Sequence, residues 1–203
     1  MSKSTHKPWQ NILVLYLHGF LSSPQSHKAQ QTLKYCQDLG LAEQVFIPEL
    51  SANPAEDIAQ LCGFIEANRQ HNIVLIGSSL GGYYAGYLAE RYKLLAALIN
   101  PAVRPYEHWQ DYVGEHINYY SKRRHIVSKQ HKDELLSLHS ETLKYPQNYL
   151  LLVQCGDETL DYRQAVEKYR SSQSIIQAEG NHSFVNFESV LPEIFAFFAK
   201  PIA

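Results

Sequence analysis

The segment 73–92, IVLIGSSLGGYYAGYLAERY, constrains the fold more than any other part of the sequence. It begins with the apolar run Ile73–Ile76, passes through a Gly/Ser-rich turn and continues as an amphipathic stretch to Arg91. A G-x-S-x-G turn between a strand and a helix is typical of a nucleophile elbow. The sharp turn holds its central residue in a strained conformation with the hydroxyl exposed at the carboxyl end of the strand. We therefore predict that Ser79 is a nucleophile at one edge of a sheet.

Other interpretations of this turn are weaker. A phosphate-binding loop would need G-x-G-x-x-G or a following Gly-Lys-Ser/Thr, and neither is present. Ser78 lacks the flanking glycine spacing, and the remaining alternative is a Gly/Ser turn that merely joins strand to helix. We expect Gly77 and Gly81 to be small because strand and helix cross closely there. The amino terminus of the helix also directs N–H groups at this point, which suits a developing oxyanion.

Short apolar runs alternate with longer amphipathic ones along the chain, a pattern typical of the α/β class. The short runs are apolar throughout, which indicates a mostly parallel central sheet with helices on both faces. Helix signals fit this reading: Asn53 can cap a helix that has Pro54 at its first position, and Gly40 can end another. The predicted strands are Ile12–Leu17, Val45–Ile47, Ile73–Ile76, Leu94–Ile99, Tyr149–Val153 and Ser174–Ala178.

Length and composition exclude several protein classes. The 203 residues predict a single domain over 1–203, and a net charge of −2 (18 basic against 20 acidic residues) argues against a nucleic-acid partner. Three widely spaced cysteines favour free thiols in a reducing compartment. Residues 1–10 contain no apolar signal region, and no run approaches the roughly 20 apolar residues of a membrane span. We expect a cytoplasmic protein.

One stretch breaks the alternation. Between Asn100 and about Tyr145 there is no clear strand, and the residues are polar and aromatic, with five histidines and a basic run at 122–124. This is too long for an ordinary connection. We expect a small, mostly helical cap insertion at about 101–145, lying over one end of the sheet; a plain surface excursion is the alternative.

A serine nucleophile needs a base, and His182 is the best candidate among ten histidines. It follows the predicted last strand and the turn Glu179–Asn181, so it should reach the same edge of the sheet as Ser79. His18 directly follows the first strand, and we interpret it as a hydrogen-bonding residue that shapes that loop.

The base in turn needs an acid that holds its tautomer. Three acids follow the strand Tyr149–Val153. Asp161 has another role available as cap of the next helix. Asp157 is nearest the strand end and follows a glycine, so we predict that it orients the base, with Glu158 as the alternative.

The order Ser79, Asp157, His182 along the chain is that of α/β-hydrolases. In this fold the loop after the first strand builds half of the oxyanion hole, and here it reads His18-Gly19-Phe20. We predict that the backbone N–H groups of Phe20 and Leu80 bind the oxyanion, although Leu21 could donate in place of Phe20.

With these residues the chain resembles the YqiA-like esterase family of the α/β-hydrolase superfamily. The resemblance rests on LYLHGFLSSPQSHKA, IGSSLGGYYAGYLAERY, INPAVRPYE, GDETLDYRQAV and EGNHSFVNFE, which together span most of the chain. It implies a small bacterial cytoplasmic esterase or thioesterase with an α/β-hydrolase fold, and it matches Ser79, Asp157 and His182 to the family's triad. The match is weakest between Val113 and Gln147.

The resulting hypothesis is a hydrolase that cleaves carboxylic esters or acyl thioesters, such as acyl-CoA-like molecules, through an acyl-enzyme on Ser79. No metal or organic cofactor is expected. Leu21 and Tyr83 are candidate substrate-binding residues, although tyrosines at helical spacing more often serve packing. The alternative is a non-catalytic α/β-hydrolase-fold binding protein; no oligomeric state is indicated.

Overall fold

A six-stranded sheet forms the centre of the molecule. The computed structural model describes residues 11–118 and 120–199, so residues 1–10, for which we expect no secretory signal, lie outside it. All neighbouring strands of this sheet run parallel, in the order β2-β1-β3-β4-β7-β8. The strands are β1 Ile12–Leu17, β2 Val45–Phe46, β3 Asn72–Ser78, β4 Leu95–Ile99, β7 Tyr149–Gln154 and β8 Gln173–Gln177. The expected parallel α/β architecture is confirmed.

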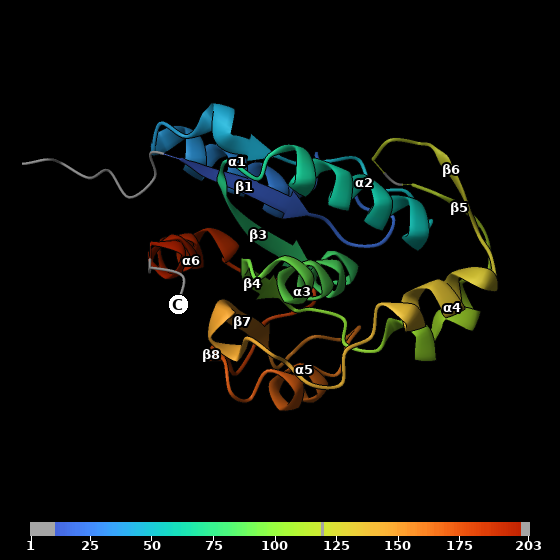
Figure 1. The fold of residues 1–203 in the computed structure, drawn as a ribbon. Helices are drawn as coiled ribbons and strands as arrows, with labels where there is room; N and C mark the ends of the chain where they lie inside the picture. Colours follow the sequence, from blue (N-terminus) through green and yellow to red (C-terminus); the bar gives the residue numbers. More distant parts are fainter. Residues whose placement is uncertain (1–10, 119, 200–203) are drawn as a thin grey trace, which may run out of the picture.

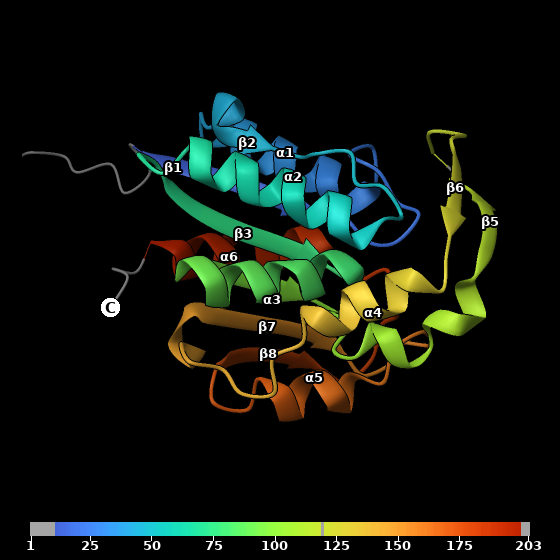
Figure 2. The same ribbon diagram turned by 45° about the vertical axis from the view of Figure 1, so that its right-hand side comes forward.

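Helices cover both faces of the sheet (Figures 1 and 2). Helices α2 (Pro54–Ala67), α3 (Leu80–Tyr92) and α5 (Tyr162–Lys168) lie on one face. On this face Leu15, Leu75 and Leu151 point into the larger core. Helices α1 (His27–Asp38) and α6 (Leu191–Phe198) lie on the other face, against a second core that contains Val14 and Ile76. Successive strand residues thus enter different cores, which explains why these runs are apolar at every position.

The helix signals read from the sequence act as expected. The Asn53 side chain accepts from the Glu56 N–H at the start of α2, with Pro54 in the first position. Asp161 accepts from the Arg163 N–H and caps α5, while Gly40, with φ +75°, follows the end of α1. The helices are α1 His27–Asp38, α2 Pro54–Ala67, α3 Leu80–Tyr92, α4 Gln130–Ser137, α5 Tyr162–Lys168 and α6 Leu191–Phe198, with short 3-10 helices η1 Ala42–Gln44, η2 Pro105–Glu107, η3 Trp109–Tyr112, η4 Pro146–Asn148 and η5 Phe187–Val190.

The insertion between β4 and β7 stands beyond the carboxyl ends of the strands (Figures 1 and 2). It contains α4 and the 3-10 helices η2, η3 and η4, in line with a helical cap, but the expectation that it has no strand is wrong. Strands β5 (Gly114–Ile117) and β6 (Arg124–Val127) form an antiparallel hairpin. Burial alternates along both strands, but Ile117 and Ile126 occupy exposed positions (65% and 71% exposed), so the apolar residues of the sequence do not mark the buried face of the hairpin.

No helix in the described part of the chain combines the length and the apolar character needed to cross a bilayer.

Candidate active site

The turn between β3 and α3 holds Ser79 in an unusual backbone conformation. Its φ of 56° and ψ of −120° lie where a residue with a side chain is strained. The Ser79 N–H donates to the Ile99 carbonyl (3.1 Å), and the Ser79 carbonyl accepts from the N–H groups of Gly82 (2.9 Å) and Ala102 (3.0 Å). These bonds to β4 and the loop after it hold the strained turn in place.

The close approach of α3 to the first strand explains the glycine after Leu80. A Cβ on Gly81 would lie 2.1 Å from the Leu17 carbonyl oxygen, and one on Gly77 would lie 2.4 Å from the Gly81 carbonyl oxygen. Both distances are far below van der Waals contact, so larger residues would push α3 off the sheet.

Three side chains from three loops form a continuous hydrogen-bond chain. His182 Nε2 lies 3.1 Å from Ser79 Oγ, and His182 Nδ1 lies 2.8 Å from Asp157 Oδ2 and 3.0 Å from Asp157 Oδ1. The structure thus brings together the three residues predicted from the sequence, at the carboxyl edge of the sheet. In the tautomer with Nδ1–H donating to Asp157, Nε2 is free to accept the Ser79 proton.

The carboxylate of Asp157 is held in its charged form. Burial alone would raise the pKa of Asp157, but hydrogen bonds from His182 and from the N–H groups of Leu160 (2.8 Å) and Thr159 (2.9 Å) outweigh burial and lower it. Its neighbour Glu158 accepts instead from the backbone N–H of His182 (3.0 Å), and this bond lowers the pKa of Glu158. Glu158 therefore steadies the loop, while Asp157 contacts the imidazole ring.

Two amides that sequence reasoning did not assign to the site hold these loops together. The Asn100 Oδ1 accepts from the Gln154 N–H (2.9 Å), and its amide donates to the carbonyls of Asn181 (3.0 Å) and His182 (3.2 Å). The Gln154 Oε1 accepts from the N–H groups of Asn181 (3.0 Å) and Val185 (2.8 Å). Both side chains are buried. In the sequence these two residues could have been recognised as polar side chains at the carboxyl ends of the apolar strands β4 and β7.

Gly180 allows the loop that carries His182 to pass over Gln154. Its φ is +97°, and a Cβ at this position would lie 2.0 Å from Gln154 Oε1. A residue with a side chain here would separate the amide from the N–H groups that it accepts.

The loop after β1 and the first residue of α3 flank Ser79, and each contributes a backbone N–H group. Those of Phe20 and Leu80 have no hydrogen-bond acceptor within the ranges that the structure describes. Gly19 lies against Ser79, since a Cβ there would be 3.1 Å from Ser79 Cβ. The loop is shaped by buried His18, whose Nδ1 lies 3.0 Å from the Gly19 carbonyl oxygen and whose Nε2 accepts from the Leu50 N–H (3.2 Å). Burial lowers the pKa of His18, which favours this neutral form.

The insertion contacts the loop after β1 directly. The Phe20 ring packs edge-on against Trp109, Tyr112 and His116, with ring centroids 5.2, 5.4 and 5.9 Å apart. The fully buried Asn118 donates to the Ser22 carbonyl (2.7 Å). The position of the Phe20 backbone therefore depends on the insertion.

The two candidate substrate-binding residues lie elsewhere. Tyr83 is 4% exposed in the core, and its hydroxyl donates to the Leu135 carbonyl (2.7 Å) in α4. Leu21 is half-buried with φ 51°. Neither lines the cavity beside Ser79, so the packing interpretation of Tyr83 fits its surroundings.

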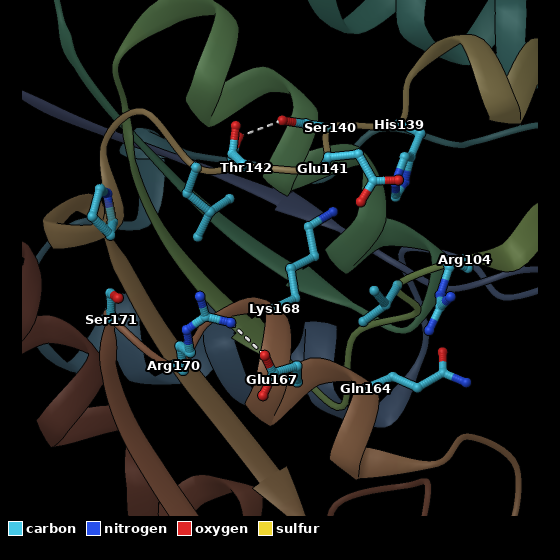
Figure 3. A pocket seen from close by; sticks show the side chains of 13 residues that line it. Arg104, His139, Ser140, Glu141, Thr142, Gln164, Glu167, Lys168, Arg170 and Ser171 are labelled. Atoms are coloured by element: carbon cyan, nitrogen blue, oxygen red, sulfur yellow. Dashed lines mark hydrogen bonds and ion pairs between the residues drawn. The ribbon is translucent and has the colours of Figure 1, made fainter.

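The cavity beside Ser79 and His182 has a volume of about 230 Å³. A larger cavity of about 490 Å³ lies between α5 and the segment 139–146, and Figure 3 shows the side chains that line it. Neither Ser79 nor His182 lines this larger cavity, and its charges mostly pair: Glu167 with Arg170, and Glu141 with His139 (3.1 Å). The Lys168 side chain extends from α5 toward the segment that carries Glu141 (Figure 3). The candidate site is therefore the smaller cavity.

Within the described ranges, no three His, Cys, Asp or Glu side chains form a group that could hold a metal ion.

Comparison with known sequences identifies one family. The model of the uncharacterised protein family UPF0227 matches residues 13–199. A UPF0227 protein from Citrobacter koseri is 24% identical over 191 residues, which cover 91% of this chain and 98% of the relative. The UPF0227 protein YcfP from Salmonella arizonae is 24% identical over 192 residues, with the same coverage.

Solved structures with the same fold are α/β-hydrolases. A putative hydrolase from Agrobacterium vitis superposes with a TM-score of 0.74 at 14% identity, covering 94% of this chain and 88% of the other. Est1E from Butyrivibrio proteoclasticus, solved with ferulic acid, gives 0.70 at 14% identity over 98% and 94%. A monoacylglycerol lipase from Paleococcus ferrophilus gives 0.69 at 14% identity over 91% and 94%. At these identities the likeness establishes the α/β-hydrolase fold.

Proposed function

The chain belongs to the uncharacterised protein family UPF0227, and we propose that it is a serine hydrolase that cleaves carboxylic esters or acyl thioesters through an acyl-enzyme on Ser79. The observation that carries this proposal is the hydrogen-bond chain from Ser79 Oγ through His182 to Asp157, with distances of 3.1 and 2.8 Å. A serine hydroxyl becomes an effective nucleophile when a base accepts its proton and an acid orients that base. Esterases and lipases among the proteins of similar fold support the same reaction class.

In the first half of the reaction, His182 accepts the Ser79 proton while Ser79 Oγ bonds to the acyl carbon. The N–H groups of Phe20 and Leu80 stabilise the negative charge on the carbonyl oxygen. The bond to the alcohol or thiol then breaks, and the leaving group takes the proton from His182. Asp157 stays charged throughout and stabilises the imidazolium.

In the second half, His182 accepts a proton from water, whose oxygen attacks the acyl-enzyme. The carboxylic acid leaves, Ser79 regains its proton, and the overall reaction consumes one water. No step requires a metal or an organic cofactor.

The proposal includes a small-molecule substrate and a location in the cytoplasm. The cavity of about 230 Å³ is below the range of about 300–1,000 Å³ usual for drug-sized ligands, which favours a small acyl group. The free state of Cys36, Cys62 and Cys155 suits a reducing compartment.

Labelling with a fluorophosphonate tests the nucleophile. We expect a single adduct on Ser79, and we expect Ser79→Ala to lower kcat on a short aryl ester by about 10⁴–10⁶-fold. Ser78→Ala is the matched control because it removes the neighbouring hydroxyl, and it should still be labelled at Ser79. Parallel rates on aryl esters and acyl-CoA thioesters of equal acyl length would establish which class is preferred.

An adduct on another residue, or full activity of Ser79→Ala, would contradict the proposed nucleophile. Folded protein that takes no label and hydrolyses no ester or thioester in the series would favour the non-catalytic binding protein.

A further inference from the structure

The cavity beside Ser79 contains a lysine and no acid. Among the described residues that line it, Lys28 is the one Lys or Arg, and none is Asp or Glu. The Asp157 carboxylate, which is paired with His182, does not belong to this lining, and its side chain is 2% exposed. Hydroxyls of Ser22 and Ser26 belong to the same lining. The lining is therefore polar, and among the side chains of Lys, Arg, Asp and Glu it contains only the positively charged Lys28.

Lys28 is held beside the base by one hydrogen bond. It is the second residue of α1, and its Nζ donates to the Ser183 carbonyl (3.0 Å), one residue beyond His182. Burial lowers the pKa of Lys28 to about 8, an effect that the charge of Asp157 partly opposes. The ammonium form therefore predominates at neutral pH.

The ammonium has donors to spare. Of its three N–H bonds one goes to Ser183, and within the described part of the chain Lys28 forms no ion pair. Lys34, further along the same helix, differs: its side chain is 73% exposed and pairs with Asp38 (3.1 Å). A partly desolvated ammonium with unused donors gains more from an anion than an exposed one does. The N–H groups in the first turn of α1 add to the positive potential.

We propose that the Lys28 ammonium binds a carboxylate of the substrate while Ser79 attacks the ester carbonyl, which makes small carboxylate-bearing esters the preferred substrates. This inference rests on the proposed hydrolase function. A single cation matches a singly charged anion, and the small cavity places that anion within a few bonds of the scissile carbonyl. The carboxylate can belong to the acyl group or to the alcohol, and these are distinguished by experiment.

Matched ester pairs test the proposal. The first pair is an aryl hemisuccinate and its methyl-capped neutral form, with the charge in the acyl group. The second pair carries the charge in the leaving group. Its charged member is the butyrate ester of a hydroxybenzoic acid, and its neutral member is the same compound with the benzoic acid methyl-esterified. We expect kcat/KM to favour the charged member of one pair by about 10–100-fold, the size usual for hydrogen bonds to charged groups.

Variants assign that preference to Lys28. We expect Lys28→Gln to reduce the charged-to-neutral ratio to about one while kcat/KM on the neutral ester changes only a few-fold. Lys28→Arg should retain the preference because the charge is retained. Lys34→Gln removes a lysine from the same helix outside the cavity, and it should leave both rates unchanged.

The outcomes separate this proposal from the proposed function. If the protein hydrolyses neither esters nor acyl thioesters, the hydrolase function fails; if it hydrolyses neutral esters with a charged-to-neutral ratio near one, or thioesters alone, only the role of Lys28 is overturned. If Lys28→Gln lowers kcat/KM equally on the charged and the neutral ester of a pair, Lys28 only positions the loop at 182–183. That result would also overturn the proposal. Should Lys28→Gln not fold, competition on the unaltered protein decides: succinate should inhibit neutral-ester hydrolysis competitively and succinamide should not, and equal inhibition would contradict the proposal.

Discussion

Asp57, in the first turn of α2, is a carboxyl group that the fold buries almost completely. It is 1% exposed; its Oδ1 accepts from the Ser51 N–H (2.6 Å) and hydroxyl (3.0 Å), while its Oδ2 has no partner within the described residues. Burial raises the pKa of Asp57 to about 7, because the charged form loses its hydration. The protonated carboxyl is therefore the form that suits the folded protein below neutral pH.

We predict that Asp57 makes the protein less stable as pH rises from about 4 to about 7. In this window the unfolded chain releases the proton, at a pKa of about 3.9, before the folded chain does. The raised pKa implies a loss of roughly 4 kcal/mol in the free energy of unfolding across the window. Urea unfolding at pH 5, 6.5 and 8 measures it: Asp57→Asn should lose less stability with rising pH than the unaltered protein. The exposed Asp38 on α1 supplies the control, Asp38→Asn; parallel pH profiles for all three proteins would contradict the prediction.

At the scale of elements, the loops after β4, β7 and β8 act as one unit at the carboxyl edge of the sheet. Gln154, the last residue of β7, connects them: besides accepting from Asn181 and Val185, its amide donates to Gln177 Oε1 (2.6 Å) and to the Val185 carbonyl (2.9 Å). Buried N–H groups that lose such an acceptor cost about 1–3 kcal/mol each. The position of His182 therefore depends on the side-chain amide of Gln154, which binds the backbone on both sides of His182.

We predict that Gln154→Met, which keeps the side-chain length but removes the amide, lowers kcat on a neutral ester by at least about 10-fold, because it releases the loop that carries His182. The free energy of unfolding should fall by about 2–4 kcal/mol. Steady-state kinetics and urea unfolding measure the two effects. The same substitution at the exposed Gln37 on α1 should change neither quantity. A Gln154→Met protein with unaltered kcat would show that the amide network does not position His182.

At the scale of the whole molecule, the insertion and the sheet share one core. Trp109 is 3% exposed and belongs to the same buried cluster as Leu15, Leu75 and Leu151 of the sheet, and it packs against Phe20 in the loop after β1. The insertion is thus part of the packing that holds the loop after β1, which is consistent with the proposal that residues 1–203 form a single domain.

We predict that the insertion unfolds together with the sheet. In Trp9→Phe protein the remaining tryptophan, Trp109, reports on the insertion by fluorescence, while far-ultraviolet circular dichroism reports mainly on the sheet and its helices. The two denaturation curves should coincide, as they do for a cooperative unit. A fluorescence transition at clearly lower urea concentration would show that the insertion unfolds independently.

The sequence by itself determined the sheet strands, the helix caps at Asn53 and Asp161, and the strained turn at Ser79, because apolar periodicity, capping side chains and glycine turns act over a few neighbouring residues. The tertiary structure alone decided what depends on distant contacts. The hairpin β5–β6 escaped prediction because Ile117 and Ile126 occupy its exposed positions and because its place depends on Asn118, which donates to the Ser22 carbonyl, 96 residues away. Lys28 and Gln154 gain their places at the site in the same way: each hydrogen-bonds to the loop that carries His182, across 155 and 27 residues, and no local pattern encodes such a distance.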